Sequence, residues 1–171
     1  PATGSVAPGV VVHKRRQLTL NKVMGMPVTV NGIAYPGGPL EVLVNNTKYM
    51  GIDKKVVRPD FTPITINGIT TYYSELPVEG ETELWEIINL TADAHPMHTH
   101  LTQFQILNRQ PFDVAKYLAA YAAAYGGVVK DASGPPLDYN TPNADGALGG
   151  NPAVTPFLRK NKIQPPAPGE E

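Results

Sequence analysis

Apolar and polar residues alternate in short runs through the first two thirds of the chain, and this period is typical of half-buried β-strands. Three runs rich in Val, Leu, Ile and Thr predict strands near Gln17–Met24, Glu41–Asn45 and Glu83–Asn89. A fourth run predicts a strand over His98–Leu107, with its apolar even-numbered residues facing the core. Several short strands at this spacing favour an antiparallel β-sandwich or barrel.

Turn residues support the same fold class. The pairs Asn31-Gly32 and Asn67-Gly68 each lie between two β-like runs, and this dipeptide is the usual signal for a two-residue type I′ hairpin. The chain also has 16 glycines and 18 prolines among its 171 residues, a content that favours many turns and few long helices.

The pattern changes after Phe112. Asp113 is a suitable N-cap, the following residues are rich in alanine, and Gly126-Gly127 is a stop signal, so we predict one helix over Val114–Tyr125. Residues 128–171 show almost no periodicity and end in a proline-rich stretch, "QPPAPGEE". Such a long irregular segment is unusual inside a compact domain, so we expect either that a further part of the protein follows Glu171 or that another chain holds this segment.

Composition narrows the possible functions. The formal net charge of -1 and the pI of about 6.5 give no reason to expect nucleic acid or an anionic membrane as a partner. No apolar run approaches the roughly 20 residues that span a bilayer. The first residues place their charges after the apolar part, the reverse of a signal peptide. Cysteine is absent, which excludes disulfides and thiolate ligands within this chain.

Three of the four histidines lie within the six residues His95–His100, in the stretch "AHPMHTHL". In a strand, His98 and His100 would point to one face and His95 to the other, because side chains alternate with period two. Pro96 biases His95 toward extended geometry. A single histidine in a strand is usually structural, but this density indicates metal binding. Imidazole suits Zn, Cu, Fe and Ni alike, so the residues alone indicate a transition metal.

The context of these histidines resembles one family. The segment "ELWEIINLTADAHPMHTHLTQFQILNRQPFDVAKY" contains a WxxxN strand, HPxHxH and RxPFD in the order found in the third, C-terminal cupredoxin domain of multicopper oxidases. It is similar to the branch of bacterial spore-coat laccase and bilirubin oxidase. "RRQLTLNKVM", "LVNNTKY" and "PPAPGEE" also resemble parts of that domain. The resemblance implies an all-β, cupredoxin-like antiparallel β-sandwich (Greek key) with one short helix and a long Pro/Gly-rich loop.

Carried over by position, the resemblance implies that His95 is a ligand of a type 1 copper, His98 of a type 2 copper and His100 of a type 3 copper. Such an oxidase takes single electrons from phenols or aromatic amines and reduces dioxygen to water at a trinuclear cluster. The catalytic groups are the copper ligands themselves. The family also implies an extracytoplasmic location, secreted or on a spore coat or cell surface.

The chain departs from the family pattern in one respect. A type 1 site needs a cysteine thiolate and a second histidine, yet there is no cysteine and no histidine after His100. We therefore expect a fragment, inactive alone: residues 1–14 as a linker from a preceding domain, 15–125 as the cupredoxin-like core, and 126–171 as a long loop that stops before the closing strands. Its expected partners are the first and second cupredoxin domains and a C-terminal Cys/His segment, with a small aromatic substrate and dioxygen.

Two other functions stay open at this point. A cupin-like mononuclear iron or zinc dioxygenase also uses HxH, although Gln103 and Gln105 stand where a cupin usually has Glu. A non-catalytic β-sandwich interaction domain would need no metal. Near the cluster, Asp93 is a candidate either for hydrogen-bonding a ligand imidazole or for a turn, and Met97 is a candidate either for a position near a copper or, as we expect, for filling space in the packing.

Overall fold

The computed structural model describes residues 4–48 and 61–167. Its main sheet has the order β4-β1-β7, with β1 (Lys14–Gly25) between β4 (Gly38–Val44) and β7 (Glu83–Asn89). Strands β1 and β4 are antiparallel, whereas β1 and β7 are parallel. The structure is thus mostly β with one helix, as predicted, and is consistent with a cupredoxin-like β-sandwich. The parallel pair was not predicted.

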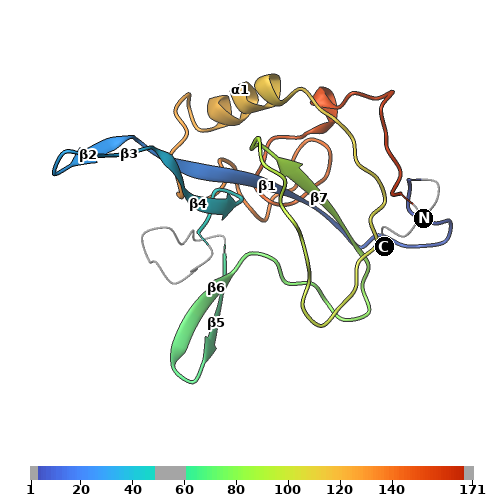
Figure 1. Cartoon of the computed structure of the whole chain (residues 1–171). Helices are drawn as coiled ribbons and strands as arrows, with labels where there is room; N and C mark the ends of the chain where they lie inside the picture. The colour runs from blue at the N-terminus through green and yellow to red at the C-terminus, as the bar shows by residue number, and fades with distance from the viewer. Residues whose placement is uncertain (1–3, 49–60, 168–171) are drawn as a thin grey trace.

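Two hairpins extend from the sheet (Figure 1). One pairs β2 (Val28–Val30) with β3 (Ile33–Tyr35), and the other pairs β5 (Thr62–Ile66) with β6 (Ile69–Tyr73). Each turns through an Asn-Gly pair with positive φ at both residues, 50° and 78° in each case. This is the geometry of a type I′ turn, so both hairpin predictions are confirmed.

The predicted helix is confirmed as α1 (Val114–Ala124). The Asp113 carboxylate accepts a hydrogen bond from the Lys116 amide at 3.1 Å, as an N-cap should. Helix α1 buries Tyr117 and Tyr121 against Ile88 of β7, forming the main apolar cluster of the core. No helix in residues 4–48 or 61–167 is long and apolar enough to cross a membrane.

The strand predicted over His98–Leu107 is wrong. Residues 96–107 form no strand and are mostly exposed, including Phe104 at 46% and Met97 at 46%, so Met97 does not fill the core. A strand needs a neighbour to pair with its backbone, and within the described residues this segment has none. Alternating sequence alone therefore did not produce a strand.

The Pro/Gly-rich segment has little regular structure, apart from the 3₁₀ turn η1 (Thr155–Phe157), but it packs closely on β1. Leu148 pairs with the N-terminal half of β1: the Gln17 amide donates to the Leu148 carbonyl at 2.8 Å. The fully buried Asn151 donates to the Gln17 carbonyl at 2.7 Å. At Gly149, φ is 122° and an added Cβ would lie 2.2 Å from the Gln17 carbonyl oxygen, so only glycine fits.

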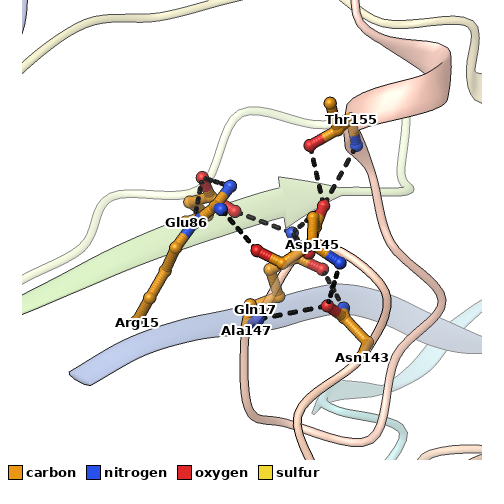
Figure 2. Close-up of polar contacts among 7 residues, drawn as sticks. All are labelled: Arg15, Gln17, Glu86, Asn143, Asp145, Ala147 and Thr155. Carbon is orange, nitrogen blue, oxygen red and sulfur yellow. Dashed lines mark hydrogen bonds and ion pairs between the residues drawn. The ribbon is translucent and has the colours of Figure 1, made fainter.

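A polar cluster fixes this segment to the sheet (Figure 2). The side-chain amide of the buried Gln17 donates to the Glu86 carboxylate of β7 at 2.7 Å, and its oxygen accepts from the Asn143 side chain at 2.8 Å. Asp145 accepts from the Thr155 hydroxyl at 2.8 Å. Side-chain hydrogen bonds thus replace the strand ladder that this irregular segment lacks.

Candidate metal centre

All three clustered histidines lie in the long loop that follows β7. Figure 1 shows this segment running away from the sheet before it returns to α1. The loop leaves the sheet at Asn89, the last residue of β7, whose register partner on the central strand is Leu20. The sheet therefore fixes where the loop begins.

The structure brings His98 and His100 together. Their Nε2 atoms lie 3.1 Å apart, and the ring centroids are 5.1 Å apart with the planes tilted by 32°. A local turn produces this approach, since the Thr99 hydroxyl donates to the Thr102 carbonyl at 2.7 Å and Leu101 has a φ of 64°. Both imidazoles are exposed, so groups from another polypeptide can reach them.

His95 is held separately, close to the end of β7. Its Nε2 lies 2.7 Å from the Thr91 hydroxyl oxygen. That hydroxyl lies 2.8 Å from Asn89 Oδ1, which also accepts from the Thr91 amide at 2.9 Å. Asn89 Nδ2 donates to the Asp93 carbonyl at 2.8 Å. The half-buried imidazole is thus tied to the last residue of a strand through a tight turn.

Asp93 does not contact the imidazole of His95 with its carboxylate. The Asp93 carboxylate accepts from the Lys22 ammonium at 2.6 Å, and this hydrogen bond and charge lower the pKa of Asp93. The Thr91 hydroxyl, and not the Asp93 carboxylate, makes the hydrogen bond to the His95 imidazole. Sequence reasoning missed it, although an Asn-x-Thr triplet at the end of a strand is a signal for a turn closed by side-chain hydrogen bonds.

The three imidazoles are suitable copper ligands, but they can form only part of a complete copper site. Imidazole nitrogen is a good copper ligand. The Nε2 atoms of His98 and His100 face each other, so at most one proton lies between two neutral rings and at least one lone pair points into the gap. Across residues 4–48 and 61–167, no three His, Cys, Asp or Glu side chains are grouped closely enough to hold a metal. Completing a copper centre would require further ligands.

Comparisons with known proteins point in the same direction. A family model described as multicopper oxidase matches residues 41–140, more than half of the chain. The chain is 46% identical over 54 residues to a laccase of Bacillus subtilis (strain 168), a match covering 32% of this chain and 10% of that protein.

Two further relatives extend this comparison. A laccase of Bacillus stratosphericus is 41% identical over 54 residues, covering 32% of this chain and 11% of the relative. The multicopper oxidase LPR1 of Arabidopsis thaliana is 36% identical over 80 residues, a match covering 45% of this chain and 14% of the relative. The matches thus cover about a tenth to a seventh of these relatives. No solved structure matches.

Proposed function

Because the chain belongs to the multicopper oxidase family, we propose that it supplies histidine ligands to the copper centres of a laccase-like oxidase. In this proposal His95 binds the type 1 copper, His98 the type 2 copper and His100 a type 3 copper. When bound, copper would supply one-electron oxidation of a phenolic or aromatic-amine substrate and reduction of dioxygen to water.

The observation that carries the proposal is the separation of the three imidazoles into two kinds. His98 and His100 face one another at 3.1 Å in an exposed turn, as two ligands directed into one shared site would. His95 is instead half-buried and bonded to Thr91. One ligand for one centre and two for another is the division that the family motif implies.

We propose that the remaining parts of the same oxidase, its first and second cupredoxin domains and a C-terminal Cys/His segment, complete both centres. The chain has no cysteine to supply the thiolate of a type 1 site, and its described residues form no three-donor group. This chain's own part is to place three imidazoles on a loop anchored to β7, with two of them exposed for contact with another domain.

The hairpin β2–β3 supports a contact with further polypeptide. Its register places Val28, Val30, Ile33 and Tyr35 on one face, where each is between 50% and 59% exposed. No charged residue occurs from Met26 to Leu40. A two-stranded hairpin is marginally stable on its own in water, and an exposed apolar face of this kind usually meets a partner.

Single substitutions in the copper-loaded oxidase that contains this chain test the assignment. His95→Ala should abolish the blue type 1 absorbance and leave much of the trinuclear copper. His98→Ala and His100→Ala should keep the blue absorbance and lose oxygen reduction. The control is His13→Ala, because the His13 imidazole only accepts a bond from the Thr82 amide. Loss of the same copper signal in all three loop variants would contradict the division.

The requirement for other domains has its own test. Residues 1–171 expressed alone and supplied with copper should not oxidise a phenolic dye, and activity should return when the complementary domains are added. Turnover by this chain alone would contradict the proposal. Metal analysis of the assembled protein should find copper, whereas a single iron or zinc per chain would favour the cupin-like mononuclear alternative.

A further inference from the structure

The turn that follows β7 does more than end the strand, because it fixes one ring nitrogen of His95. We propose that Thr91, supported by Asn89, is a positioning residue: it accepts a hydrogen bond from Nε2–H of His95 and leaves Nδ1 as the nitrogen that is free to bind a metal. The statement that Nδ1 binds a metal rests on the proposed function of His95. The hydrogen bonds among Asn89, Thr91 and His95 do not depend on that function.

The orientation of the Asn89 amide follows from its neighbours. One end of the amide lies 2.8 Å from the Asp93 carbonyl oxygen, which can only accept, so that end is the Nδ2 donor. The other end is therefore Oδ1. It faces the Thr91 amide and hydroxyl at 2.9 and 2.8 Å, and it can only accept. Flipping the amide would set carbonyl against carbonyl.

The Thr91 hydroxyl has a single proton to donate. If it donates to Asn89 Oδ1, its oxygen can accept Nε2–H of His95 at 2.7 Å, and both contacts are hydrogen bonds. If it donates to His95 Nε2 instead, the contact with Asn89 Oδ1 brings two acceptors together at 2.8 Å. The first arrangement makes one more hydrogen bond, so it fixes His95 as the Nε2–H tautomer.

This tautomer distinguishes His95 from the other two histidines. Its Nδ1 carries the lone pair, whereas His98 and His100 direct Nε2 toward each other. Metal-bound histidines usually donate their second ring N–H to an acceptor, which sets the orientation of the ring. Here the acceptor is a hydroxyl whose proton goes to the side chain of Asn89, the last residue of β7, so a residue of the sheet determines how the ring is presented.

Nitrogen-15 NMR of the metal-free full chain tests the arrangement without copper. In the wild type, the His95 ring should show one tautomer and a protected Nε2 proton. Thr91→Val keeps the shape but removes the acceptor, so exchange of that proton with water should become about fivefold faster, the change expected for loss of one ordinary hydrogen bond. Thr91→Ser keeps the hydroxyl and should restore the wild-type signal. Thr102→Val, in the same loop, should have no effect.

A second pair of variants tests the same arrangement without changing Thr91. Asn89→Leu removes the nearer acceptor of the hydroxyl proton and leaves the Asp93 carbonyl at 3.3 Å, so the preference for a single tautomer should weaken. Asn89→Asp keeps the nearer acceptor but sets its second carboxylate oxygen against the Asp93 carbonyl, so it should preserve the tautomer at a cost in stability. Unchanged His95 signals in both Thr91→Val and Asn89→Leu would overturn the proposal, as would failure of Thr91→Ser to restore them. Failure of the proposed function would appear separately, as blue absorbance that persists in His95→Ala.

Discussion

The ion pair between Arg16 and Glu83 leads to a quantitative prediction about stability. It joins β1 to the start of β7: Arg16 Nε donates to Glu83 Oε2 at 2.7 Å and Arg16 Nη2 donates to Oε1 at 3.0 Å. The Trp85 indole also donates to Glu83 Oε2 at 2.7 Å. Only 5% and 6% of the two charged side chains are exposed, so water cannot replace a missing partner.

Glu83→Gln keeps the size of the side chain and one acceptor oxygen but removes the charge, leaving the buried guanidinium without the carboxylate that pairs with it. Breaking a buried pair in this way usually costs about 3–5 kcal/mol. A natural domain has only about 5–15 kcal/mol of stability in total, so the loss would be large. The exposed pair Lys48–Glu41, with side chains 38% and 39% accessible, is the matched control. Glu41→Gln should cost about 0–1 kcal/mol.

Urea unfolding followed by circular dichroism measures both variants on the same scale. A pH series adds a second check. Burial alone would raise the pKa of Glu83, but hydrogen bonds from Arg16 and Trp85 outweigh it and lower that pKa. The stabilisation is therefore present above the ordinary carboxyl pKa and is lost as pH falls through the folded-state pKa. The cost of Glu83→Gln should shrink in acid. A cost no greater than that of Glu41→Gln at neutral pH would refute the reasoning.

Three further predictions concern the segment packed on β1. Gly149→Ala should lower the free energy of unfolding in urea titrations by about 1–3 kcal/mol or more, because the new Cβ would clash with the Gln17 carbonyl oxygen. The control Gly38→Ala should cause no such loss, because an added Cβ there meets no atom within 4 Å. Burial alone would raise the pKa of Asp145, but hydrogen bonds and Arg15 lower it, so Asp145→Asn should destabilise at pH 7 and match the wild type in acid unfolding. Asn46→Asp sets a carboxylate oxygen against two backbone carbonyls and should lower the thermal midpoint markedly, with Asn46→Ala milder.

Local signals in the sequence predicted much of this fold. The Asn31-Gly32 and Asn67-Gly68 turns formed as expected because a type I′ turn is determined by the two residues within it. The helix followed from the Asp113 cap, the alanine-rich stretch and the paired glycines. The strand Glu83–Asn89 was predicted with the bounds that the structure shows. Each of these features depends on residues close together in the chain.

Features that depend on distant partners were not predictable in this way. The run His98–Leu107 alternates like a strand but has no neighbouring strand within the described residues. The segment from Gly126 onward lacks periodicity, yet it places Tyr139 and Asn151 in the core with 1% and 0% exposure. Its contacts with β1 join residues more than a hundred positions apart, and no local pattern encodes them.

The contacts of the three histidines show what this chain can fix by itself. His95 is joined to β7 through a hydroxyl and an amide, a short path that ends on the central sheet. His98 and His100 contact each other in an exposed turn, and no path of this kind connects their rings to the sheet in the described part of the chain. The orientation of the first imidazole is therefore built into this chain. The orientation of the other two has to be set by groups outside this part of the chain, and the proposed copper centre, completed by other segments of the oxidase, would account for both arrangements.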